Sequence, residues 1–315
     1  MPEHVEAETD RKLCRILSLD GGGAKGFYSL GVLKEIEGLV GSPLSEKFDL
    51  VFGTSTGAII AALISLGFKT DQIHTLYKEH VPRVMKASGR TEKSRVLAEL
   101  AVKVFGETTF EGVKTGIGIV ATRWTTERPM IFKGNIAQTH GRQGTFVPGF
   151  GVTIAEAVQA SCSAYPFFHR KTVTTGDGDR VELIDGGYCA NNPTLYAIAD
   201  ASAAMKIVHA DMRVVSVGVG TYPEPKPSFW AGLIRKNLVS VQLLQKTLEI
   251  NTQSMDQLRK LLFSDVPTVR ISDTFERPEM ATDLLEHNVE KLSILHQRGR
   301  DSFATHEAQL KAFLL

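Results

Sequence analysis

The sequence predicts an α/β protein with a mainly parallel central sheet flanked by helices in three layers. Strand-like and helix-like patterns alternate as far as about residue 219, which is the order of βαβ units. Residues 213–219 are almost continuously apolar, as is typical of a parallel strand covered on both faces. Glycine-rich turns directly follow apolar runs at residues 20–26, 53–57 and 185–187. In an open parallel sheet such turns meet at one edge, where ligands bind.

Composition is that of an ordinary globular protein. The 315 residues are 43% hydrophobic and 23% charged, with a formal net charge of +1. That balance gives no reason to expect a DNA or RNA duplex as partner. No apolar run reaches the roughly 18 residues that span a bilayer, and the polar start is unlike a signal peptide. Cys14, Cys162 and Cys189 have no metal-ligand spacing, so we expect a reduced, cytoplasmic setting and no metal.

The chain divides into a flexible tail at residues 1–13 and a single domain at 14–315. Within that domain we expect a catalytic core at about 14–220 and a helical C-terminal portion at about 228–315. The apolar patterns predict strands at 15–19, 48–52, 116–122, 129–133, 181–184 and 213–219, and helices at 58–64, 70–85, 95–105, 153–163, 192–204, 228–262, 282–295 and 298–314.

The turn Gly53-Thr54-Ser55-Thr56-Gly57 is the centre of the functional prediction. A Gly-x-Ser-x-Gly between a strand and a helix is the nucleophile-elbow pattern. Its glycines permit a turn too tight for side chains on either side. Ser55 is therefore a candidate nucleophile at the N-terminus of the following helix.

The loop Asp20-Gly21-Gly22-Gly23-Ala24-Lys25-Gly26 exposes backbone N–H groups at the mouth of a helix. Such a loop binds a phosphate or an oxyanion. Gly21, Gly23 and Gly26 also match the dinucleotide fingerprint, with Glu46 and Asp49 at about the distance of a ribose-binding acid. A dinucleotide-binding oxidoreductase is thus an alternative, although this short motif is common.

Asp185, in the third turn, is the candidate base for Ser55. Burial would raise the pKa of its carboxyl group and make it a better proton acceptor. The alternative is a turn-forming aspartate without chemistry. The order Ser55, Asp185, His209 would also suit a triad, but His209 lies in a polar connection, where we expect a surface residue. Nothing in the spacing of the other candidates assigns them to the site; these are His80, His140 and His169.

Together, the three motifs resemble the patatin-like phospholipases over about residues 14–220. The small-residue turn at residues 160–166, which ends in a proline, is also similar to that family. The resemblance implies a Ser-Asp dyad without histidine or organic cofactor, with Ser55 as nucleophile and Asp185 as base for the acyl esters of glycerolipids. It places the oxyanion hole at Gly21, Gly22 and Gly23. The supporting motif positions are Lys25, Gly26, Gly53, Gly57, Gly186 and Gly187, of which Lys25 replaces a common arginine and Gly187 a common alanine.

Size and layout are also similar to bacterial antiphage effectors that cyclic oligonucleotides switch on to degrade membrane phospholipids. That resemblance implies a second anion site, for which the candidates are Arg123, Trp124, Arg128 and Lys133, or Arg298 and Arg300. It implies action at the inner membrane face and leaves a homo-oligomer open. The mixed segment 229–236 is a candidate for membrane contact, whereas residues 165–168 fit a core or channel wall better. A non-catalytic nucleotide-sensing module is the remaining alternative.

Overall fold

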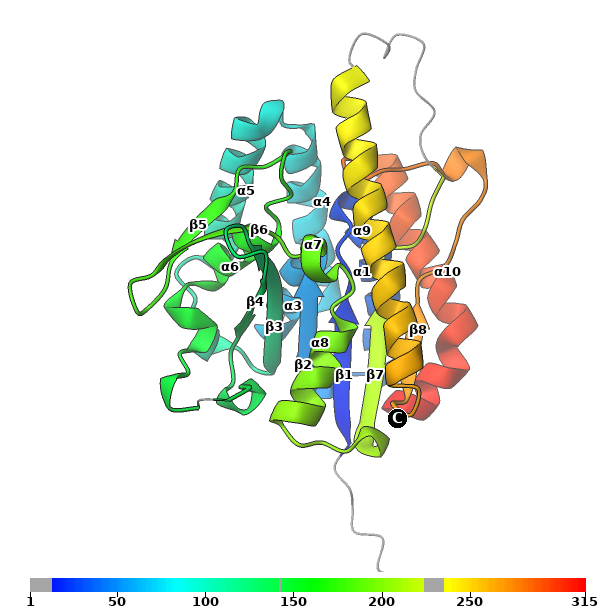
Figure 1. The fold of residues 1–315 in the computed structure, drawn as a ribbon. Helices are drawn as coiled ribbons and strands as arrows, with labels where there is room; N and C mark the ends of the chain where they lie inside the picture. The colour runs from blue at the N-terminus through cyan, green and yellow to red at the C-terminus, as the bar shows by residue number, and fades with distance from the viewer. Residues whose placement is uncertain (1–12, 142, 224–234) are drawn as a thin grey trace, which may run out of the picture.

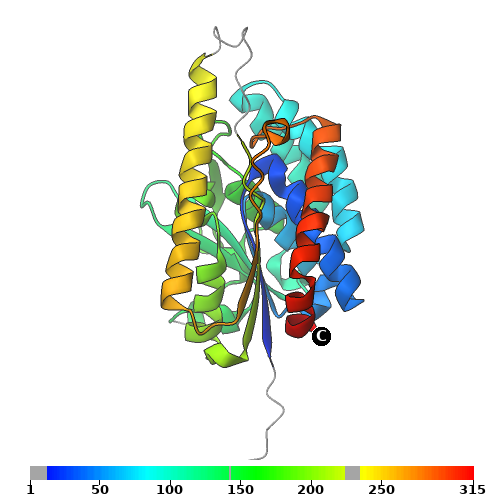
Figure 2. The same ribbon diagram turned by 90° about the vertical axis from the view of Figure 1, so that its right-hand side faces the viewer.

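The computed structural model describes residues 13–141, 143–223 and 235–315. Figures 1 and 2 show three layers, with the sheet between two sets of helices. Helices α8 (Thr194–Ala199) and α9 (Arg235–Leu262) lie on one face of the sheet. The opposite face carries α1 (Gly26–Val40), α4 (Thr70–Lys86) and α10 (Val289–Leu314). The described part of the chain therefore has the α/β architecture that the alternating pattern predicts.

The central sheet has the order β5-β6-β3-β2-β1-β7-β8, and β4 pairs with β3. The run β3-β2-β1-β7-β8 is parallel, while β4, β5 and β6 pair antiparallel. The strands are β1 (Cys14–Leu19), β2 (Leu50–Thr54), β3 (Gly116–Arg123), β4 (Pro129–Lys133), β5 (Lys171–Thr174), β6 (Arg180–Asp185), β7 (Met212–Val217) and β8 (Thr268–Ile271).

Strand β3 brings the ends of two other strands together. β2 pairs with residues 116–120 of β3 and β6 with residues 121–123. Because β4 pairs with residues 118–122 and overlaps both, it occupies the opposite edge of β3. β2 and β6 therefore lie end to end along one edge, and they run in opposite directions. Their C-terminal ends face each other, which places the residues after β2 against the end of β6.

The sheet buries both faces, as its near-continuous apolar strands predict. Leu17 and Leu19 of β1 belong to the larger core cluster, with α1 and with α3 (Thr56–Ser65). Ile16, on the other face, packs with Ala197 and Ile198 of α8. This alternation follows from the two-residue period of strand side chains.

Helices α1 and α10 cross at two glycines. A Cβ atom on Gly31 would lie 2.0 Å from the carbonyl oxygen of His296, and one on Gly299 would lie 2.0 Å from that of Tyr28. Only residues without a side chain permit this backbone approach. The two predicted helices at 282–295 and 298–314 are therefore wrong, because α10 is one helix and Gly299 is a contact point within it.

The C-terminal portion is not purely helical, which corrects a second expectation. β8 adds a parallel strand beside β7, so this part of the chain completes the sheet. The predicted loop between residues 85 and 95 is also shorter than expected, since α5 begins at Gly89. The expected helix at 153–163 is α6, with Thr153 and Glu156 forming a capping box. The remaining α-helices are α2 (Leu44–Lys47), α5 (Gly89–Phe105), α6 (Ile154–Ser161) and α7 (Gly187–Ala190).

Candidate active site

Ser55 lies on the sharp turn between β2 and α3. Its backbone has φ 53°, a left-handed conformation that non-glycine residues rarely adopt. A Cβ atom on Gly53 would lie 2.2 Å from the carbonyl oxygen of Gly57, and one on Gly57 would lie 2.3 Å from that of Leu19. Both flanking glycines are thus required by close backbone contacts, as the elbow pattern predicts.

The turn is held in place by α6. The N–H group of Ser55 donates to Ser161 Oγ at 2.9 Å, and Ser161 Oγ donates to the carbonyl oxygen of Val120 at 2.6 Å. The strained residue is therefore tied to β3 through one buried hydroxyl group. Ser161 belongs to the small-residue turn that the sequence singles out.

Asp185 ends β6 and faces Ser55 across the meeting point of the two strands. The Asp185 side chain is buried, with 1% of the residue exposed. Burial raises the pKa of the Asp185 carboxyl group to about 7, although hydrogen bonds from the Gly187 N–H and the Ser55 hydroxyl pull it down. The Gly187 bond measures 2.7 Å to Asp185 Oδ1. The carboxyl group is thus a stronger proton acceptor than a solvated aspartate, and it lines the same cavity as Ser55.

Two of the three predicted oxyanion donors in the first glycine loop have N–H groups without a partner among the described residues. Gly22 and Gly23 line one cavity together with Ser55 and Asp185, and neither N–H donates to a described residue. The N–H of Gly21 instead donates to the carbonyl oxygen of Asn191 at 2.9 Å, so Gly21 is not a free donor. This corrects the prediction for Gly21, whose N–H anchors the loop. Gly23 has φ 57°, a conformation that suits glycine.

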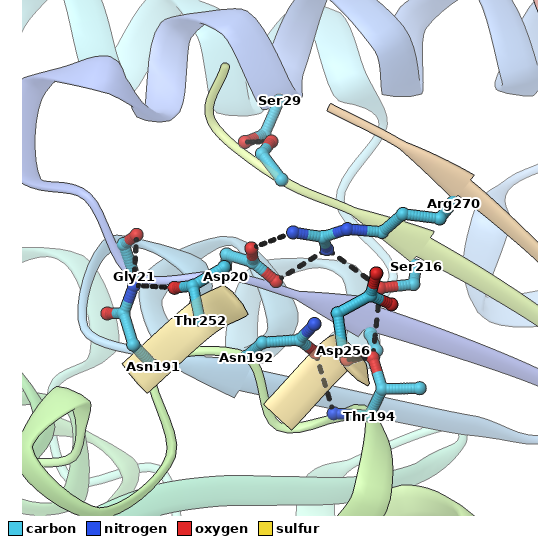
Figure 3. A network of polar contacts seen from close by, with 12 residues as sticks. Asp20, Gly21, Ser29, Asn191, Asn192, Thr194, Ser216, Thr252, Asp256 and Arg270 are labelled. Carbon is cyan, nitrogen blue, oxygen red and sulfur yellow. Dashed lines mark hydrogen bonds and ion pairs between the residues drawn. The ribbon is translucent and has the colours of Figure 1, made fainter. Parts of the chain in front are cut away.

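A buried polar network supports the glycine loop from behind, as Figure 3 shows. Asp20 pairs with Arg270 of β8 through both carboxylate oxygens. Asn191 donates to the carbonyl oxygen of Gly21 at 3.2 Å and to the hydroxyl of Thr252 in α9 at 2.7 Å.

Lys25 is buried and pairs with Glu249 of α9 at 3.3 Å. The loop is therefore joined to this helix directly through Lys25 and indirectly through Asn191, which also bonds Thr252. The supporting residues Asn191, Thr252, Glu249 and Arg270 belong to no sequence motif, and sequence reasoning missed them.

Beside the dyad lies an apolar cavity of about 120 Å³. It extends between α3, α4, α5 and α6, and its far wall is aliphatic and aromatic. Such a wall suits a hydrocarbon chain, because burial of apolar surface is favourable and no polar partner is needed. Phe167 and Phe168 line the cavity, which confirms the expectation of a channel wall for part of residues 165–168. Other lining residues include Ile59, Leu63, Leu97, Leu100, Val158 and Leu248.

The histidines lie apart from the dyad or form its apolar surroundings. His209 contacts Asp265 at 2.8 Å, and His140 contacts Asp200 at 2.7 Å. His169 contacts Thr91 on the surface. His80 lines the cavity, but burial lowers the pKa of its ring and neither ring nitrogen has a hydrogen bond within the described residues. The described residues thus place no histidine against Ser55.

Three of the predicted anion-binding side chains already have partners, among them Arg298, which pairs with Asp301 at 3.6 Å. Lys133 pairs with the buried Asp200 at 2.6 Å, which removes it from the list of free surface cations. Arg300 pairs with Glu35. The candidate membrane segment 229–236 lies mostly outside the described residues, and nothing is described of its side chains.

The fold and the turn at Ser55 define an α/β protein of the kind that carries a serine at a strand-to-helix elbow. Within that class, the chain belongs to the patatin-like phospholipase family, whose model matches residues 17–198. This membership replaces the dinucleotide-binding alternative, since the glycine loop lies beside Ser55 as the family resemblance implies.

Two curated relatives cover 96% and 74% of this chain. A cUMP-AMP-activated phospholipase from Escherichia coli is 69% identical over 96% of this chain and 94% of its own. A cGAMP-activated phospholipase from Vibrio cholerae is 27% identical over 74% of this chain and 72% of its own. The solved structure of VipD from Legionella pneumophila is similar in fold, with a TM-score of 0.50 and 12% identity over 96% of this chain and 67% of that one. Among the described helices, none combines the length and apolarity that a membrane span requires.

Proposed function

We propose that this protein hydrolyses acyl esters of glycerophospholipids through Ser55 and Asp185 and that a cyclic oligonucleotide activates it. The observation that carries the proposal is that Ser55 and the buried Asp185 line the same apolar cavity, where the Ser55 hydroxyl acts on the pKa of the Asp185 carboxyl group. The activator is inferred from the relatives named for cUMP-AMP and cGAMP activation.

The chemistry follows from the positions of these groups. Asp185 accepts the hydroxyl proton as Ser55 Oγ attacks the ester carbonyl carbon. The N–H groups of Gly22 and Gly23 stabilise the negative charge that develops on the carbonyl oxygen. The lysolipid leaves with a proton returned by Asp185, and water then hydrolyses the acyl-enzyme by the same steps in reverse. The acyl chain occupies the apolar cavity throughout.

The substrate determines where the protein works. Phospholipid is present in membranes, so the protein must act at a membrane surface from the aqueous side. Action at the inner, cytoplasmic face of the membrane and a role in antiphage defence stay predictions.

The test is product analysis by mass spectrometry with mixed bacterial phospholipids, with and without cUMP-AMP. We expect free fatty acid and lysophospholipid from the wild type with the activator. Ser55→Ala and Asp185→Asn should each lower the rate by about 10³-fold or more, because each removes a group that acts in every turnover. The control is His209→Ala, which should retain activity because His209 lies away from the cavity.

The outcome distinguishes the proposal from a non-catalytic sensing module. A sensing module would bind cUMP-AMP, release no fatty acid and show no covalent labelling of Ser55 by a fluorophosphonate. That combination of results would refute the proposed reaction.

A further inference from the structure

Four side chains from separate segments form an arginine–aromatic cluster, defined here as Arg90, Trp124, Tyr165 and Arg170. The guanidinium carbon of Arg170 lies 4.8 Å from the centroid of the Trp124 ring and 5.9 Å from that of Tyr165. That of Arg90 lies 4.9 Å from the same Tyr165 centroid. The two aromatic rings are 5.6 Å apart. One tyrosine ring therefore gathers two cations from different parts of the chain.

The cluster adjoins the dyad and the cavity. Just before Tyr165 in the chain, the carbonyl oxygen of Ser163 accepts the backbone N–H of Asp185 at 3.0 Å. Ala164 and Phe167, on either side of Tyr165, line the apolar cavity. Trp124 is 40% exposed, so the cluster lies at the surface. The segment that carries Tyr165 thus contacts both Asp185 and the cavity wall, which connects the cluster to the site.

The charges of the cluster are unbalanced. Arg170 pairs with Glu182 at 3.1 Å, whereas Arg90 forms no ion pair with a described residue. Its Nε donates to the carbonyl oxygen of Pro166 at 2.7 Å, which orients the guanidinium group and leaves its charge uncompensated. The cluster thus has two guanidinium charges, of which only that of Arg170 is paired with a carboxylate.

The chemistry of these side chains suits a phosphate group. Stacking on an aromatic face holds a guanidinium plane in one orientation and leaves its N–H edge available. Arginine in that arrangement binds phosphate through paired, charge-assisted hydrogen bonds. Tryptophan and tyrosine are also favoured where apolar and aqueous regions meet, which is where a phospholipid head group lies.

We propose that Arg90 and Arg170 form a subsite for the phosphodiester of the glycerophospholipid whose acyl ester lies at Ser55. This inference rests on the proposed function, because it assigns the phosphate of the same substrate. A phosphodiester also occurs in cyclic nucleotides, so the experiment must separate these two sources.

A matched pair of monomeric lipids isolates the phosphate. Dihexanoylphosphatidylglycerol and dihexanoylglycerol have the same acyl esters, and only the first has a phosphodiester. We expect Arg90→Gln and Arg170→Gln each to lower kcat/KM for the phospholipid by about 10-fold to 100-fold at saturating cUMP-AMP, as expected when a charge-assisted hydrogen bond is lost. The rate with dihexanoylglycerol should stay within about twofold.

The control variant is Arg95→Gln, on the same helix as Arg90. Arg95 pairs with Glu92 and Glu99, so its removal changes net charge equally without touching the cluster. It should leave both rates unchanged. If Arg95→Gln lowered kcat/KM for the phospholipid as much as Arg90→Gln, the change in net charge would explain the loss. That result would overturn the subsite.

Other outcomes also decide the matter. Equal losses with both lipids would indicate a structural role and overturn the proposal, as would an unchanged phospholipid rate. A shift only in the cUMP-AMP concentration for half-maximal activity would assign the cluster to the activator instead. Hydrolysis of dihexanoylglycerol by the wild type upholds the ester hydrolase whichever way the arginine variants behave.

A binding measurement covers the case in which turnover is slow. In a Ser55→Ala background, Arg90→Gln should raise the calorimetric Kd for dihexanoylphosphatidylglycerol by about tenfold or more. An unchanged Kd would overturn the subsite without any reference to catalysis.

Discussion

At the scale of single residues, Ser55 and Asp185 are each held in a costly state. A non-glycine residue at φ 53° stores strain of about 1–3 kcal/mol, which the contacts of Gly53, Gly57 and Ser161 impose. The Asp185 side chain is buried, although an ionised carboxylate is more stable in water. In the proposed reaction both features serve reactivity, since one aims a hydroxyl group and the other makes a carboxylate a stronger base.

The raised pKa of Asp185 predicts how activity depends on pH. The base must be ionised, and its pKa of about 7 means that a falling pH protonates it near neutrality. We expect kcat/KM for dihexanoylglycerol to fall about tenfold per unit below that pKa and to level off above it. This neutral substrate keeps its own charge constant during the titration. A rate constant that stays level down to about pH 5 would contradict the assignment of Asp185 as base.

At the scale of elements, the α1–α10 crossing depends on two glycines. Gly299→Ala would place a methyl group against the carbonyl oxygen of Tyr28, and backbone atoms cannot move aside cheaply. We expect a loss of about 1–3 kcal/mol in the free energy of unfolding, measured in urea.

Gly38 of α1 provides the control for this prediction. A Cβ atom there meets nothing within 4 Å, so Gly38→Ala should stabilise the protein by about 0.5–1 kcal/mol through helix propensity. If Gly299→Ala also raised the free energy of unfolding, the crossing would not be tightly packed.

Helix α5 forms one wall of the apolar cavity in which we propose that the acyl chain binds. Ala101 is buried and lines the cavity, whereas its neighbour Val102 is 54% exposed. Ala101→Phe should lower the rate for long acyl chains by about tenfold relative to hexanoyl chains, because the ring fills space that the longer chain needs. Val102→Phe should leave the preference unchanged. Equal chain-length profiles for the two variants, measured on mixed-chain lipids, would place the acyl chain elsewhere.

At the scale of the whole molecule, β8 and the first glycine loop are joined by a buried ion pair. Asp20 and Arg270 are 250 positions apart in sequence, and Arg270 also donates to Ser216 at 2.8 Å. Arg270→Met would leave the Asp20 carboxylate buried without its cation. We expect a loss of about 3–5 kcal/mol in the free energy of unfolding.

The double variant Asp20→Asn with Arg270→Met tests the cause of that loss. Removing the charge on Asp20 should recover part of the stability, since the buried uncompensated carboxylate is the main cost. If the double variant were less stable than Arg270→Met alone, the loss would come from packing of the arginine stem.

Most strands and the serine turn could be predicted because their signals are local. The apolar runs that become β1, β2, β3 and β7 need no information about partners. β5 and β8 were missed, since each has only four residues, too few for a periodic pattern to stand out. The break predicted between residues 295 and 298 was wrong, and the role of Gly299 could not be predicted, because a contact between helices leaves no local pattern.

The sequence by itself determined the turn at Ser55, the candidate dyad and the family, because glycine spacing and apolar periodicity constrain the neighbouring backbone. Only the tertiary structure decided that β6 runs antiparallel and reaches Ser55 end to end, and that the N–H of Gly21 is already bonded. The same is true of the partners of the buried Asp20 and Lys25 side chains. Such pairings join residues that are far apart in sequence. They therefore depend on how the whole chain packs and not on any local pattern.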